Sequence, residues 1–196
     1  MGEISTWGHW VVAGLEWKES GLADLPDLKA QVLAVLFAAG RPLSLRELSP
    51  LGSEEALTRA LMALERDLTD GRLGVWLERV AGGWRLVVHA LHLPAVERVL
   101  RPTPPRISKA ALEVLAIIAY QQPLTRAELE ALRGKSVEGV LEGLIERQLV
   151  RVVGEKDAVG RPKLYGTTDR FLEMFGLESL ADLPPLGEGP VLLLRS

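Results

Sequence analysis

The residues able to do covalent chemistry are few in this chain of 196 residues, and their spacing favours no reaction. There is no cysteine, which excludes disulfides, thiolate nucleophiles and cysteine-based zinc sites. The histidines, His9, His89 and His92, lack the spacing of metal ligands or of a general base. Gly134-Lys135-Ser136 looks like the end of a phosphate-binding loop, but position 129 is leucine instead of the required glycine. We therefore predict that the protein is not an enzyme and holds no cofactor or metal.

Composition points to an ordinary globular protein. Hydrophobic residues make up 47% of the chain and charged residues 25%, and the net charge is −3. The N-terminus lacks the basic stretch and apolar run of a secretory signal, and no run of 18 apolar residues occurs. We expect a cytoplasmic protein with no membrane contact.

One pattern occurs twice, about eighty residues apart. Pro42–Leu48 and Pro123–Leu129 both read P-L-[ST]-x-x-E-L, and Glu65–Leu68 returns as Glu146–Leu149 at the same offset. A repeat of this length suits a small domain and is too long for a solenoid unit. The chain is therefore expected to contain two copies of one fold.

Helix signals appear in the same order in both copies. In the first copy the apolar run Leu28–Ala39 predicts a helix, and Ser44 with Glu47 forms a capping box for a short second helix that ends near Pro50. Ser53 is expected to cap a third helix, whose apolar stripe consists of Leu57, Leu61, Leu64 and Leu68.

The second copy repeats these signals. Ser108 is expected to cap a helix that runs to Tyr120, Thr125 with Glu128 repeats the capping box, and Ser136 is expected to cap the third helix. The residues of this third helix that we expect to face inward are Val140, Leu141, Leu144 and Ile145.

Each set of helices is followed by a predicted hairpin and a short helix. In the first copy strands 75–80 and 84–88 flank Gly82-Gly83, and a helix covers 93–100. In the second copy strands 150–153 and 163–167 precede a helix over 169–175.

Three helices followed by a hairpin are typical of a helix-turn-helix with a β-wing. The predicted fold class is therefore α+β, mainly helical, with two tandem winged-helix domains. Pro102, Pro104 and Pro105 indicate a semi-rigid linker. The predicted divisions are an N-terminal extension (1–27), a first domain (28–100), the linker (101–106), a second domain (107–176) and a flexible tail (177–196).

The N-terminal extension has two open interpretations. Trp7, Trp10, Val11 and Leu15 fall at helical spacing. This segment either folds back onto its own domain or frays, or it is an arm that binds a partner.

Winged helices most often bind DNA with their third helix, so a DNA-binding transcriptional regulator is the alternative hypothesis. Residues 53–70 carry five acidic and two basic side chains, and residues 136–147 carry three acidic and one basic. Acidic helices repel the phosphates of DNA, so this charge argues against DNA binding by these two helices. Two interpretations stay open for the second predicted wing. Its basic residues either contact the DNA backbone or belong to a solvated turn; they are Lys156, Arg161 and Lys163.

The positive signal is apolar surface on the first helix of each copy. Residues 32–39 and 114–120 are hydrophobic on every side, which requires burial all round. Either a partner chain covers the outer side, or the wing and the last helix of the same domain do so.

The second copy closely resembles a known signature. Its matching stretches are 112–129, Arg133-Gly134, 160–168, 171–177 and 183–185. Together with a weaker match in the first copy, these residues resemble the segregation and condensation protein B family from about Leu28 to Leu186. Lys135, where the family usually has an apolar residue, and residues 1–27 depart from the pattern.

The resemblance implies a non-enzymatic subunit of the bacterial SMC–condensin complex. It implies an N-terminal domain that forms a homodimer and a C-terminal domain that binds the kleisin ScpA, which links it to the SMC ATPase. The expected role is chromosome condensation and segregation, with association to the nucleoid through the complex and no direct specific DNA binding. The partner-binding candidates are Tyr120, Arg133, Tyr165, Phe171 and Phe175, and the dimerisation candidates are Leu33, Leu36 and Phe37.

Overall fold

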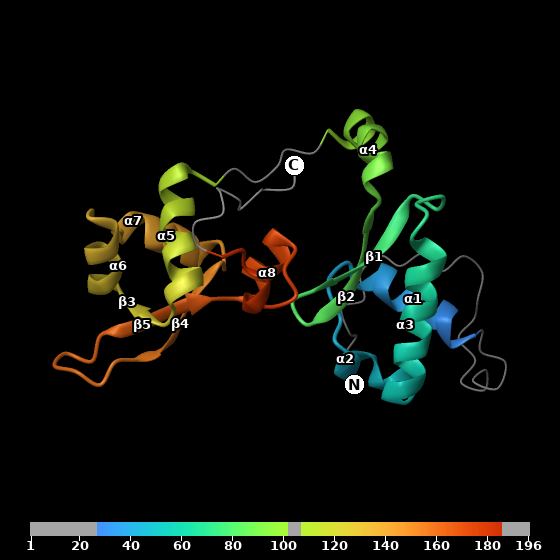
Figure 1. The fold of residues 1–196 in the computed structure, drawn as a ribbon, viewed down its shortest axis with the longest axis horizontal. Coiled ribbons are helices and arrows are strands. Elements are labelled where there is room, and N and C mark those ends of the chain that lie inside the picture. The colour runs from blue at the N-terminus through green and yellow to red at the C-terminus, as the bar shows by residue number, and fades with distance from the viewer. Residues whose placement is uncertain (1–26, 102–106, 186–196) are drawn as a thin grey trace, which may run out of the picture.

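The computed structural model describes residues 27–101 and 107–185 (Figure 1). Within these ranges the protein is mixed α and β, mainly helical, with two small sheets. The N-terminal extension up to residue 26, linker residues 102–106 and tail residues 186–196 lie outside the described residues, so the predictions made for them are not addressed by the structure.

The helices of the first half begin and end where their caps predict. The side chain of Asp27 caps α1 (Leu28–Ala39), which Gly40 ends with a left-handed φ of 59°. The predicted capping box of Ser44 and Glu47 is present at α2 (Leu45–Leu48). Ser53 caps α3 (Glu54–Leu68), which buries the predicted leucine stripe.

The hairpin turns one residue earlier than predicted. Strand β1 (Val75–Val80) pairs antiparallel with β2 (Gly83–Val88), and the turn residues are Ala81 and Gly82, both with positive φ. Gly83 belongs to the strand instead, where it pairs with Val80, and a Cβ there would lie 2.9 Å from the backbone of Leu43. Leu43 and Trp84 exchange two backbone hydrogen bonds of 2.9 Å, which tie the segment before α2 to the hairpin.

The two described histidines hold the junction between the hairpin and α4 (Leu93–Leu100). Nδ1 of His89 accepts from the N–H of Leu91 in the 3-10 turn Ala90–His92, and Nε2 of His92 lies 2.8 Å from the carbonyl oxygen of Gly71. Gly71 has a φ of 70°, and a Cβ there would meet the His89 ring at 2.8 Å. These rings therefore serve the local structure.

The second half repeats the order and adds one short strand. The three-stranded sheet has the order β3-β5-β4 with antiparallel pairing, and β3 pairs Leu124 with Tyr165. Thr125 and Glu128 form the predicted second capping box. The elements are α5 (Lys109–Gln121), β3 (Leu124–Thr125), α6 (Arg126–Arg133), α7 (Glu138–Glu146), β4 (Val150–Glu155), β5 (Lys163–Thr167) and α8 (Asp169–Phe175).

Two predictions about α7 are wrong. Ser136 does not cap it, because the helix begins after Val137 without a side-chain cap. The Glu130 carboxylate accepts from the Val137 N–H at 3.2 Å instead, so a side chain from α6 satisfies this donor. Ile145 is 38% exposed and does not face inward, whereas Leu141 and Leu144 are buried as expected.

The expectation of a flexible tail is wrong for residues 177–185. Leu177 and Leu183 pack against the core of the second half, and a 3-10 turn spans Leu180–Asp182. The hydroxyl of Tyr120 donates to the carbonyl oxygen of Pro184 at 2.5 Å. The described part of the tail is therefore held in place.

Each half has its own cluster of buried side chains. The first cluster joins α1 and α3 to the hairpin, and the second joins α5, α6 and α7 to the sheet and α8. The first helices differ, because α5 buries four residues whereas α1 buries only Val32 and Leu36 and leaves Phe37 74% exposed. The outer side of α1 is thus open within the described structure.

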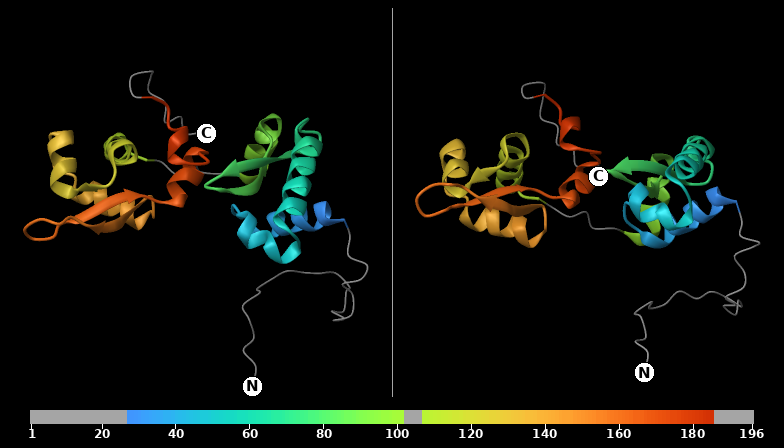
Figure 2. Two further views of the ribbon diagram at one scale, coloured as in Figure 1. Left: turned by 60° about the horizontal axis from the view of Figure 1, so that its bottom comes forward. Right: turned by 90° about the horizontal axis from the view of Figure 1, so that it is seen from below.

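The two halves meet at a contact that we call the clasp, formed by the β1–β2 turn and the segment after α8 (Figures 1 and 2). The N–H groups of Ala81 and Gly82 donate to the carbonyl oxygens of Leu177 and Glu178 at 2.9 and 3.1 Å. Arg79 pairs with the Glu178 carboxylate at 2.7 Å. The clasp thus includes two backbone hydrogen bonds and one ion pair between the halves.

Candidate partner-binding surfaces

A shallow crevice in the second half surrounds Tyr120, one of the predicted partner-binding residues. It encloses about 530 Å³ and is lined by Ala119, Tyr120, Gln122, Leu180, Ala181, Leu183, Pro184 and Pro185. Its walls come from α5 and the segment after α8. Leu180 is 40% exposed at its edge. Most of the lining is apolar, so the crevice suits an apolar side chain of a partner.

The side of the crevice is held by a hydrogen-bonded glutamine. Oε1 of Gln122 accepts from the Thr167 N–H at 2.7 Å, and its Nε2 donates to the Thr167 hydroxyl at 2.9 Å. Because these bonds join the end of α5 to β5, they fix the position of Gln122 relative to the sheet.

A second hollow lies beside Tyr165. It encloses about 310 Å³ and is lined by Arg126, Ala127, Glu130, Pro162, Lys163 and Tyr165. Arg126 pairs with Glu138 at 2.8 Å, and the backbone N–H of Val137 lowers the pKa of Glu130. The lining of this hollow combines an aromatic ring with charged side chains, whereas the lining of the crevice at Tyr120 is mostly apolar.

The remaining predicted residues of the second half line neither the crevice nor this hollow. Arg133 is largely buried and donates to the carbonyl oxygen of Ser136 at 2.7 Å, while its Nε lies 3.6 Å from the Glu113 carboxylate. Phe171 is fully buried, and its ring centroid lies 4.9 Å from that of Phe175. Phe171 therefore has no surface to offer a partner, and its contacts are those of the core.

Lys156 and Arg161 in the wing of the second half are engaged by carboxylates. Lys156 pairs with Glu128, and this pair, with the Thr125 bonds, lowers the Glu128 pKa to about 2. Arg161 pairs with Glu155 at 3.2 Å. Acidic side chains also occupy the first turns of α3 and α7, the position at which a DNA phosphate would approach the recognition helix of a winged-helix domain. This arrangement disfavours the alternative of a DNA-binding regulator.

The dimerisation candidates of the first half divide by exposure. Leu36 is 1% exposed and belongs to the core, and Leu33 packs partly against that core. Phe37 is the exposed member of the three. The role in dimerisation stays a prediction, and Phe37 is the side chain available for it.

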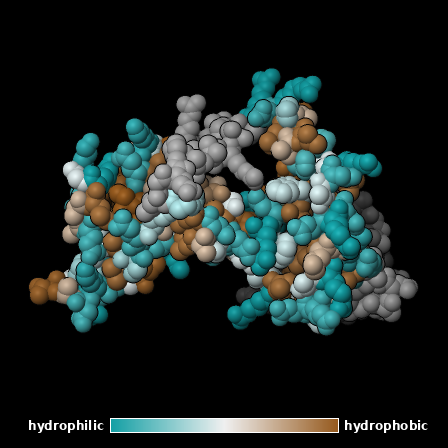
Figure 3. Space-filling model, viewed as in Figure 1, coloured by the Kyte–Doolittle hydropathy of each residue, from teal (hydrophilic) through white to brown (hydrophobic). Residues whose placement is uncertain are grey.

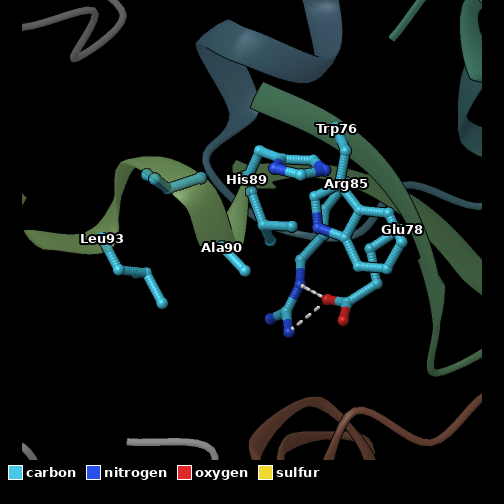
Figure 4. A pocket seen from close by; sticks show the side chains of 8 residues that line it. Trp76, Glu78, Arg85, His89, Ala90 and Leu93 are labelled. Carbon is cyan, nitrogen blue, oxygen red and sulfur yellow. Dashed lines mark hydrogen bonds and ion pairs between the residues drawn. The ribbon is translucent and has the colours of Figure 1, made fainter. Parts of the chain in front are cut away.

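Another hollow, which the sequence interpretation missed, lies between the hairpin and α4 (Figure 4). It encloses about 490 Å³, and we call it the hairpin hollow; its lining residues are Trp76, Glu78, Arg85, Val87, Val88, His89, Ala90 and Leu93. Next to it, α4 has no buried residue, and Val99 and Leu100 are 78% and 71% exposed. The apolar spacing of Leu93, Val96 and Leu100 was the available signal.

The described ranges contain no group of three or more His, Asp or Glu side chains suited to a metal ion. No helix in these ranges is long and apolar enough to cross a membrane.

Comparison with known proteins gives consistent matches. The family described as segregation and condensation complex subunit ScpB matches residues 30–186. Segregation and condensation protein B of Syntrophotalea carbinolica is 46% identical over 167 residues, which are 84% of this chain and 85% of that protein. The protein of the same name from Moorella thermoacetica is 46% identical over 162 residues, 82% of this chain and 83% of that protein.

A solved structure of a ScpB N-terminal domain dimer complexed with ScpA peptide was also matched. It is 29% identical, covers 39% of this chain and 92% of that chain, and has a TM-score of 0.36.

Proposed function

The chain belongs to the segregation and condensation protein B family, and on this premise we propose that it is a non-enzymatic subunit of the bacterial SMC–kleisin complex. It binds the kleisin ScpA, and the kleisin links it to the SMC ATPase. Its role is in chromosome condensation and segregation. Its place is the cytoplasm, in association with the nucleoid through the complex. The observation that carries the proposal is the family match over residues 30–186, which extends across both halves.

The proposal assigns a different binding function to each of two winged-helix domains. Residues 28–100 form the dimerisation domain and residues 107–176 the kleisin-binding domain, joined by the linker 101–106. Two separate clusters of buried side chains support two units, because each half buries its own core. The repeated order of three helices and a hairpin supports the winged-helix assignment.

The kleisin surface that we propose comprises the Tyr120 crevice and the Tyr165 hollow. Apolar walls and an exposed Leu180 suit an apolar anchor of the kleisin, and the Arg126, Glu130 and Lys163 side chains beside Tyr165 suit a polar flank. Phe171 supports this surface from the core instead of touching the partner. Residues 1–27 have no assigned role in this proposal.

Co-purification tests the proposal with the full chain and a tagged central segment of the kleisin. We expect Leu180→Glu to weaken binding tenfold or more, about 1.4 kcal/mol, because it places a carboxylate at the apolar crevice. Tyr165→Ala tests the second hollow in the same assay.

Leu132→Glu is the matched control, because Leu132 is 50% exposed on α6 and lines neither hollow. Circular dichroism checks that every variant is folded. Failure of the folded wild-type chain to retain the kleisin contradicts the function, whereas equal losses for both leucine variants contradict the proposed surface.

A further inference from the structure

The segment that follows α8 takes part in two features of the structure, and we call it the strap (residues 177–185). At its beginning it forms one side of the clasp, through the carbonyl oxygens of Leu177 and Glu178. Further along it forms one wall of the crevice at Tyr120, with Leu180, Ala181, Leu183, Pro184 and Pro185. The strap therefore connects the first half of the chain to a crevice whose lining residues all belong to the second half.

The two ends of the strap are anchored by different halves of the chain. At the far end, the hydroxyl of Tyr120 donates to the carbonyl oxygen of Pro184, and Leu183 packs against the core of the second half. At the near end, the strap accepts the two backbone hydrogen bonds of the clasp, and the Glu178 carboxylate pairs with Arg79. Figure 3 shows the two halves in contact there, at the position that α8 and the tip of the hairpin have in Figure 1. The first half thus supplies part of what holds the strap.

The part of the strap between these anchors is an exposed turn. Residues 179–182 are all exposed, and Ser179 and Asp182 form a capping box within the turn. Bonds of this local kind define the shape of a turn, whereas its position depends on the residues that flank it. Leu180, at the edge of the crevice, follows Glu178 by only two residues. The position of this wall therefore depends on the clasp.

We propose that the clasp regulates kleisin binding at the Tyr120 crevice, with Arg79 as a positioning residue that acts through Glu178 and the strap. A wall that is already held in place costs less entropy to order when a partner binds. Formation of the clasp therefore raises the affinity of the crevice for the kleisin, and kleisin binding stabilises the clasp by the same free energy. This inference rests on the proposed kleisin site and adds to it a regulatory contact from the other domain.

The ion pair of the clasp is the contact best suited to a test. The Arg79 and Glu178 side chains are 56% and 40% exposed, and exposed pairs are weak and are screened by salt. The Arg79 guanidinium also lies over the ring of Trp84, 5.4 Å from its centroid, which holds the side chain at the hairpin. Neither Arg79 nor Glu178 belongs to the buried cluster of its half, so replacing them leaves both cores intact.

Charge reversal tests the role of this pair in kleisin binding, measured with the full chain and the central kleisin segment. We expect Arg79→Glu and Glu178→Arg each to weaken binding about twofold to tenfold, because each replaces an attractive pair of charges with a repulsive one. The double variant Arg79→Glu/Glu178→Arg restores opposite charges and should regain most of the lost affinity. Arg59→Glu is the matched control, because it reverses a charge in the exposed pair with Glu55 on α3, outside the clasp, and should bind as the wild type does.

Amide hydrogen exchange provides a second measurement, which needs no kleisin. The N–H groups of Asp182 and Leu183 donate to carbonyl oxygens within the strap at 3.2 and 3.3 Å. We expect their exchange to be about twofold to tenfold faster in Arg79→Glu than in the wild type and to slow again in the double variant. Conversely, saturating the wild type with the kleisin segment should slow exchange at Ala81 and Gly82, although neither residue lines the crevice.

The outcomes separate this inference from the proposed function. Failure of the folded wild type to retain the kleisin overturns the proposed function and the regulation with it. A wild type that binds, together with charge-reversed variants that bind equally well, overturns the regulation alone. Weaker binding in both single variants without recovery in the double variant shows that the two side chains act separately, and this result also overturns the positioning role of Arg79.

Discussion

At the scale of single residues, Gly83 illustrates how one missing side chain allows two segments to meet. The backbone of Leu43 passes so close to Gly83 that a Cβ would lie 2.9 Å from its carbonyl atoms. This approach lets Leu43 and Trp84 exchange their hydrogen bonds, which attach the segment before α2 to the hairpin. The conformation of Gly83 itself is compatible with any residue, so the constraint is steric.

We therefore expect Gly83→Ala to destabilise the protein by about 1 to 3 kcal/mol, the range typical of overpacking. The contrasting substitution is Gly143→Ala in α7, where a Cβ meets nothing within 4 Å. It should stabilise the protein by about 0.5 to 1 kcal/mol, because alanine loses less entropy in a helix. Urea unfolding measures both changes. Equal effects for the two variants would contradict the proposed steric role of Leu43.

At the scale of elements, the repeated capping boxes set the start of α2 and α6. In each box a hydroxyl accepts from the N3 amide, and the N3 carboxylate accepts from the cap amide. These bonds favour the ionised carboxylate. The backbone N–H of Ser44, with Arg41, lowers the pKa of Glu47 to about 2, and the Lys156 ammonium with Thr125 does the same for Glu128.

The lowered pKa values predict acid sensitivity. A carboxylate with a folded pKa of about 2 and an ordinary value of 4.5 contributes stability above pH 4.5 and loses it as the pH falls towards 2. We expect Glu128→Gln to be less stable than the wild type at pH 7 and to match it only below about pH 2, where the wild-type carboxyl group is neutral as well. Urea unfolding across this range measures the difference. A difference that does not change with pH would be inconsistent with the carboxylate's role.

At the scale of the whole molecule, the clasp connects two units that each have a core of their own. The clasp consists of backbone hydrogen bonds at Ala81 and Gly82 and the Arg79–Glu178 ion pair. Beside it, Arg85 of β2 donates to the carbonyl oxygen of Glu173 in α8 at 3.1 Å. Contacts between the domains of one chain are typically more polar than obligate interfaces, and the hydrogen bonds and ion pair of the clasp are of this kind.

We expect Glu178→Ala to increase amide hydrogen exchange at Ala81 and Gly82 by about 1.4-fold to 5-fold, which corresponds to ~0.2 to 1 kcal/mol for an exposed ion pair. The effect should shrink at high salt, because exposed charges are screened. Glu55→Ala, which removes the exposed pair with Arg59 on α3, is the control and should leave these two amides unchanged. Unchanged amide exchange at Ala81 and Gly82 in Glu178→Ala would show that the Arg79–Glu178 ion pair does not stabilise the clasp.

The sequence by itself determined the local structure of this protein. Capping boxes, the bounds of helices that carry them, and the presence of both hairpins depend on hydrogen bonds and apolar spacing among near neighbours, which can be recognised in the residues themselves. The start of α7 is an exception, because a side chain from α6 bonds its first amide. The family was likewise recognisable, because its signature consists of short stretches of consecutive residues, two of which contain Tyr120 and Tyr165, and the family match over residues 30–186 includes them.

The tertiary structure alone decided which apolar faces are covered. The first helices of the two copies are alike in composition, yet α5 is largely packed while α1 leaves Phe37 exposed. Phe171, a candidate either for the core or for partner contact, lies in the core, and α4, a helix that the sequence predicts, has no buried residue. Burial depends on contacts between residues far apart in the chain, such as Ala81 with Leu177. The spacing of apolar residues along one helix does not indicate these contacts.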